Sequence, residues 1–171
     1  MINVFISHTH EDAQEVQGLK LNIVKKFGDS ISLAISSDFS HGPEVGEEWE
    51  DWIKEKIRQS HAMVFFVTSN TKNSKYMDFE RMYAQEHKKK IIPFVYDDSK
   101  IPPLLSRFQA IKAGDRNERM KNLITCLDKA IKEEDKRVMK RIYSSENVVP
   151  FLLLGPVGLV AKKLIDEVRK K

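Results

Sequence analysis

Short runs of apolar residues alternate along this chain with longer stretches in which apolar residues recur at helical spacing. The runs predict β-strands at residues 2–6, 31–35, 62–68 and 91–96, with a short fifth candidate at 108–111. The run 62–68 carries no charge and is rich in aromatic and β-branched residues, which is typical of a strand buried on both faces of a parallel sheet. Pro93 removes one backbone donor from its run and indicates either a position at the sheet edge or a local irregularity.

Four stretches between or after these runs predict helices, at residues 11–27, 47–60, 77–87 and 115–134. In the second stretch Trp49, Trp52, Ile53 and Ile57 share one stripe, and charged residues fill the other positions. Strands that alternate with helices in this way indicate an α/β fold with a doubly wound parallel sheet of four or five strands.

Residues 135–171 break the alternation, so we expect a domain over 1–134 followed by a C-terminal helical and apolar extension over 135–171. Residues 138–143 could continue the preceding helix, and the segment 148–154 is almost wholly apolar. Because soluble proteins rarely expose such a run, we expect it to pack on the domain or on a second copy and to set the oligomeric state. A membrane surface is the less favoured alternative, since two acidic residues dilute the basic ones near the C-terminus.

Composition narrows the class of protein. Of the 171 residues, 41% are hydrophobic and 32% charged, which suits one soluble globular domain. The net charge of +4 is too small to indicate nucleic acid as a partner, and the single cysteine, Cys126, excludes a disulfide framework. The first eight residues do not resemble a signal peptide, and the longest uncharged run is shorter than the roughly 20 residues of a membrane-spanning helix. We therefore expect a cytoplasmic protein.

In a parallel sheet, ligands bind beyond the carboxyl ends of the strands, which selects the segments 7–12, 36–46, 69–76 and 97–103. His8 and His10 could bind zinc, but no third ligand is evident, and we expect no metal site. Glu11 and Asp12 are interpreted as helix-capping residues. The segment 69–76 supplies capping residues for the next helix in the same way. The sequence lacks the glycine-rich motifs of Rossmann and P-loop sites, and Cys126 lies on an apolar stripe, where we expect it to join the core.

An ordered series of motifs over residues 1–131 resembles bacterial Toll/interleukin-1 receptor (TIR) domains. The strand end at 4–8, followed by two acidic residues, resembles the opening motif of that family, and the loop 38–46 before a tryptophan-bearing helix resembles its BB loop and helix B. Most specific is the series Ser74, Tyr76 and Glu80, followed by Ile-Ile-Pro-Phe at 91–94. The resemblance implies the TIR fold, a flavodoxin-like sheet.

Many TIR domains cleave the nicotinamide–ribose bond of NAD, and their essential glutamate corresponds to Glu80. A carboxylate beside the ribose stabilises the positive charge of an oxocarbenium-like transition state. We expect Glu80 at an exposed helix position that faces the pocket. The resemblance further implies a set of substrate-binding residues. At position 76 of this set, tyrosine replaces the tryptophan that is usual in the family. Trp49 has an alternative interpretation as a core residue paired with Trp52. The set comprises Ser7, His8, Asp38, Trp49 and Tyr76.

Two functions follow from the resemblance. The first is an NAD-cleaving enzyme, a glycohydrolase or ADP-ribosyl cyclase, with NAD as substrate and no cofactor. Resemblance to standalone TIR enzymes of Thoeris-type anti-phage defence implies self-association through TIR domains. It also implies that the reaction either makes a product that signals to a downstream effector or depletes NAD. The alternative is a non-catalytic scaffold that binds other TIR domains through the BB loop. Scaffold members generally lack the glutamate, so Glu80 favours the enzyme. A phosphate-accepting receiver domain is disfavoured, because the third strand ends in Thr68, Ser69 and Asn70 rather than in aspartate.

Overall fold

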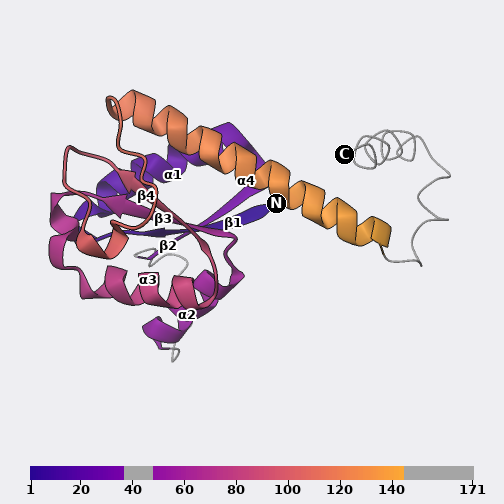
Figure 1. Ribbon diagram of the computed structural model, residues 1–171, viewed down its shortest axis with the longest axis horizontal. Helices are drawn as coiled ribbons and strands as arrows, with labels where there is room; N and C mark the ends of the chain where they lie inside the picture. Colours follow the sequence, from indigo (N-terminus) through magenta and orange to yellow (C-terminus); the bar gives the residue numbers. More distant parts are fainter. Residues whose placement is uncertain (37–47, 145–171) are drawn as a thin grey trace. The chain divides into compact units, whose positions relative to one another are not determined.

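A computed structural model describes residues 1–36 and 48–144, and a parallel sheet lies at the centre of this part (Figure 1). The strands are β1 (Ile2–Ser7), β2 (Ile31–Ile35), β3 (Ala62–Val67) and β4 (Lys90–Val95). Their spatial order is β2-β1-β3-β4, and all three strand pairs are parallel. This is the order of the flavodoxin-like doubly wound fold, so the predicted fold class is confirmed.

The predicted fifth strand is not a strand. Only Ile111 pairs with the sheet, through an isolated bridge to Phe94. The preceding residues fold back instead, because the 3-10 turn Pro103–Leu105 is followed by a hydrogen bond from the Phe108 N–H to the Leu105 carbonyl. The edge position predicted from Pro93 is confirmed, since β4 is the last strand in the sheet order.

The helices occupy the four predicted stretches. They are α1 (Ala13–Phe27), α2 (Trp49–Gln59), α3 (Lys75–Glu86) and α4 (Arg116–Ser144). Short 3-10 helices precede α1 at His10–Asp12, follow it at Gly28–Ser30, and lie before α3 at Ser69–Asn73, the last being labelled η4.

The chain divides into two compact units, Met1–Ile131 and Lys132–Lys171. The second unit is helical over 132–144, where α4 extends beyond the predicted end at 134. The remainder of the predicted extension, 145–171, lies outside the described residues, as does the predicted loop 38–46. Over 1–36 and 48–144, no helix has the length and apolar content needed to cross a bilayer.

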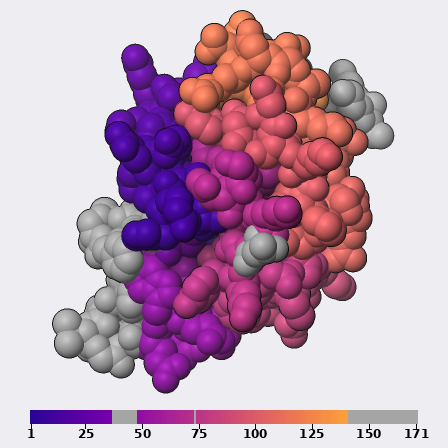
Figure 2. Space-filling model, turned by 90° about the vertical axis from the view of Figure 1, so that its left-hand side faces the viewer, coloured from indigo at the N-terminus to yellow at the C-terminus, as the bar shows by residue number. Residues whose placement is uncertain are grey.

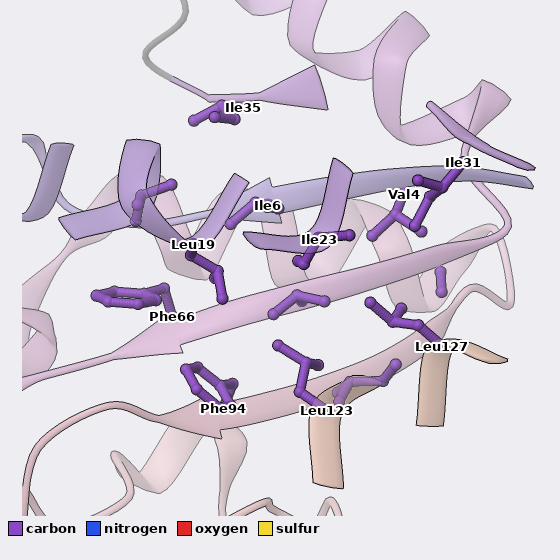
Figure 3. Close-up of a cluster of buried hydrophobic side chains, with 14 of the residues drawn as sticks. Val4, Ile6, Leu19, Ile23, Ile31, Ile35, Phe66, Phe94, Leu123 and Leu127 are labelled. Atoms are coloured by element: carbon purple, nitrogen blue, oxygen red, sulfur yellow. The ribbon is translucent and has the colours of Figure 1, made fainter. Parts of the chain in front are cut away.

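Side chains that alternate along the strands build a separate core on each face of the sheet. Val4 and Ile6 of β1 join a cluster with Leu19 of α1 and with Leu123 and Leu127 of α4 (Figure 3). Phe5 points the other way, into a second cluster with residues of α2 and α3. Each such buried side chain contributes roughly 1.5–3 kcal/mol. Cys126 packs against the first cluster, as predicted. Because strand residues alternate, Ser7 shares the face of Phe5 and is directed toward α2 and α3.

Candidate active site

A pocket of about 1420 Å³ opens beyond the carboxyl ends of β1 and β3. Its walls come from the segment after β1, the end of β2, the start of α2, η4 and the first half of α3. In Figure 2 the indigo segment of the N-terminus and the magenta segment that contains η4 and α3 lie side by side at this end of the molecule. Small-molecule sites usually measure about 300–1,000 Å³, so this pocket has room for a dinucleotide. Its position is the one predicted from the sheet topology.

Glu80 lies in the second turn of α3, and its carboxylate accepts a hydrogen bond from the Ser7 hydroxyl. Ser7 is fully buried, and Glu80 is 4% exposed although it lines the pocket. The expectation that position 80 is exposed is therefore wrong. Met77, Glu80 and Ala84 are the buried residues of α3, and the spacing of three and four residues places them on one stripe. Glu80 thus takes a core position that ends at the pocket.

Burial changes the acidity of this carboxyl group. Removal from water raises the pKa of Glu80 from 4.5 to about 8, although the hydrogen bond from Ser7 acts in the opposite direction. With this pKa, the Glu80 side chain is mostly protonated at neutral pH. A positively charged ligand beside it would favour the ionised form.

Glu80→Gln is expected to stabilise the protein at alkaline pH. The folded state holds the Glu80 proton more tightly than the unfolded chain, so this proton favours folding below pH 4.5, and the contribution is lost as the pH rises through about 8. Near pH 9 the ionised side chain costs about 5 kcal/mol that glutamine does not, which corresponds to roughly 10–20 °C in melting temperature. Thermal melts at pH values of about 5 and 9 measure this. Parallel pH profiles for the two proteins would contradict it.

His8 follows Ser7 and also lines the pocket. Its Nδ1 lies 3.0 Å from the hydroxyl oxygen of Ser36, at the end of β2. Burial lowers the pKa of His8, so the imidazole is neutral at physiological pH. Within 1–36 and 48–144, no three His, Cys, Asp or Glu side chains come together as metal ligands.

Tyr76 and Trp49 line the pocket from two different helices, α3 and α2. Tyr76 lies in the first turn of α3 and is 79% exposed, so its ring takes no part in the core. Trp49 begins α2, stacks on Trp52 with ring centroids 5.1 Å apart, and packs against the second core cluster. Trp49 therefore has both features considered from the sequence, since it pairs with Trp52 and also lines the pocket.

Asp38, the remaining predicted substrate-binding residue, lies outside the described residues. Ser36 and Trp49, close to the two ends of the undescribed segment 37–47, both line the pocket.

Asp12 has a role that the sequence reading missed. The capping interpretation of Asp12 is wrong, because its side chain does not cap α1. Its carboxylate instead accepts hydrogen bonds from the side chains of Thr9, Thr68 and Asn70. The signal in the sequence that points to these partners is the polar run of Thr68, Ser69 and Asn70 at the end of the third strand, because that strand lies beside the first in the sheet. The capping prediction for the segment 69–76 is confirmed, since the Ser74 hydroxyl accepts a hydrogen bond of 3.3 Å from the Met77 N–H.

Comparison with known proteins shows the family of the chain. Residues 4–127 match the TIR domain family. A Cytobacillus dafuensis protein named "Putative cyclic ADP-D-ribose synthase TIR2" is 32% identical over 90 residues, which is 49% of this chain and 22% of that protein. The match thus spans only about a fifth of the relative's length.

Among solved structures, the TIR domain of the Toll-related receptor TRR-2 from Hydra magnipapillata superposes with a TM-score of 0.53 at 15% identity. The superposition covers 64% of this chain and 82% of the receptor domain, and it shows a shared fold. Both the sequence match over 4–127 and the shared fold lead to one assignment: this chain belongs to the TIR domain family.

Proposed function

We propose that this TIR domain cleaves the nicotinamide–ribose bond of NAD. The observation that carries the proposal is the carboxyl group of Glu80, which is buried, hydrogen-bonded by Ser7, and yet part of the wall of a dinucleotide-sized pocket. Buried carboxyl groups with raised pKa values in a pocket are typical of functional sites, because their burial costs stability.

The chemistry follows from charge. The nicotinamide ring of NAD is cationic, so its binding beside Glu80 favours loss of the carboxyl proton. When the glycosidic bond breaks, its electron pair leaves with nicotinamide, which becomes neutral, and positive charge develops on the ribose. At about 4 Å and an effective dielectric constant of about 20, a carboxylate stabilises that charge by about 4 kcal/mol. Water then adds to the ribose carbon and loses a proton to give ADP-ribose, or an adenine nitrogen adds to give the cyclic product.

The named relative supports NAD as the substrate and favours a cyclic product. Because the shared region is a small part of that relative, the product is part of our proposal, as is a defence role in which the product signals to an effector or NAD is depleted. Self-association through TIR domains belongs to the same proposal.

The experiment that tests the proposal is incubation of the purified protein with NAD, followed by chromatographic separation and mass spectrometry. We expect equal amounts of free nicotinamide and of ADP-ribose or its cyclic form. NAD that stays intact with folded protein present at stoichiometric concentration would contradict the enzymatic proposal and favour the scaffold alternative.

A further inference from the structure

We propose that Asp12 is a positioning residue that fixes one wall of the substrate pocket by joining the segment after β1 to the segment after β3. The kinetic consequence of this inference rests on the proposed function, whereas the structural tie can be tested without it.

The tie consists of three hydrogen bonds to one carboxylate. Oδ2 of Asp12 accepts hydrogen bonds from the hydroxyl groups of Thr9 and Thr68, each at 2.7 Å. Oδ1 accepts a hydrogen bond of 2.8 Å from the side-chain amide nitrogen Nδ2 of Asn70. Asp12 is 3% exposed, so these bonds are shielded from water. Hydrogen bonds to a charged group are stronger than those between neutral groups, and their loss would leave a buried carboxylate without partners.

The bonds to Thr68 and Asn70 act on the entry to η4. The Thr68 hydroxyl that donates to Asp12 also accepts a hydrogen bond of 3.2 Å from the Asn70 N–H. The Thr68 N–H in turn donates to the Thr71 hydroxyl at 3.0 Å. Asp12 therefore fixes the hydroxyl around which η4 is built.

Hydrogen bonds connect η4 to the start of α3. The Ser74 N–H donates to the Thr71 carbonyl at 3.3 Å, and Ser74 then caps α3 just before Tyr76. Thr9, Asn70 and Tyr76 all line the pocket. A shift of η4 would thus move both the pocket wall and the ring proposed to contact the substrate.

Glu80 is held by other contacts. Met77 and Ala84 anchor its helix in the second core cluster, and Ser7 of β1 hydrogen-bonds its carboxylate. Loss of the Asp12 tie should therefore weaken substrate binding more than it slows the chemical step. This separates a positioning role from a general loss of folded enzyme, which would lower kcat and leave KM unchanged.

The kinetic test compares Asp12→Ala and Thr68→Val with the wild-type protein in NAD cleavage. We expect Asp12→Ala to raise KM by about tenfold or more while kcat changes by less than about threefold. Thr68→Val removes one donor to Asp12 and the acceptor of the Asn70 N–H, and it should have an effect of the same kind. Asp12→Asn, which keeps the volume and one accepting oxygen, should restore part of the loss. The control is Asp115→Ala, which removes the exposed cap of the Glu118 N–H on α4 and should leave KM unchanged.

Hydrogen exchange tests the tie independently of catalysis. In Asp12→Ala, the backbone amides of residues 69–77 should exchange at least about tenfold faster, while those of β4 stay unchanged. Unchanged exchange over 69–77, or an unchanged KM in a variant that does show faster exchange, would overturn the inference. If the wild-type protein neither binds nor cleaves NAD, the proposed function fails, and the exchange result alone decides whether Asp12 orders this segment.

Discussion

Glu80→Gln is expected to lower the rate of NAD cleavage by up to about a thousandfold. The amide keeps the shape of the protonated carboxyl group and can still accept the Ser7 hydrogen bond, but it carries no negative charge for the transition state. The loss of about 4 kcal/mol of electrostatic stabilisation corresponds to roughly three decades in rate. Release of nicotinamide under saturating NAD measures the effect.

The control for this substitution is Glu86→Gln, on the exposed last residue of the same helix. It removes one negative charge from α3 without reaching the pocket, and its activity should match that of the wild-type protein. A folded Glu80→Gln protein that keeps more than about a tenth of the wild-type rate would exclude Glu80 as the catalytic residue. The expected gain in stability near pH 9 provides evidence that the variant is folded.

The second large effect is expected at Tyr76. Stacking of a base on an aromatic side chain contributes about 1–3 kcal/mol, so Tyr76→Ala should lower kcat/KM by about fivefold to 150-fold. Tyr76→Trp offers a larger ring and should keep or raise kcat/KM. Because Tyr76 is 79% exposed, neither change should affect the melting temperature much.

Met82→Ala is the matched control for Tyr76, because Met82 is another exposed apolar residue of α3 and does not line the pocket. Its kinetic constants should stay at wild-type values. If the alanine and tryptophan variants at position 76 have the same kcat/KM, Tyr76 does not stack on the substrate.

The sequence predicts the fold well because strands that are buried on both faces of a sheet have uncharged, apolar sequences. The uncharged run that forms β3 is one example, and the alternation of strands with helices indicates the doubly wound sheet. The prediction of a fifth strand is wrong because the apolar character of residues 108–111 does not reveal the turn that precedes them.

At the candidate site, the sequence predicts that Glu80 faces the pocket but not that its side chain is buried. A glutamate among charged neighbours looks solvated, and only the packing of α3 shows that it shares a stripe with Met77 and Ala84. The role of Asp12 depends on partners 56 and 58 residues away, and a capping aspartate has the same local sequence. Long-range pairing of this kind is decided by the sheet order, which the local pattern does not specify.

The outer edge of β4 has a consequence for aggregation. An exposed strand edge recruits other strands through its free backbone groups. At β4, Pro93 has no N–H to offer, and its carbonyl is already bonded to the Ile111 N–H at 2.8 Å. The Val95 N–H is bonded to the Ile111 carbonyl at 3.0 Å. The segment that failed to become a fifth strand therefore protects this edge, so that neighbouring copies of the domain cannot extend the sheet through Pro93 and Val95.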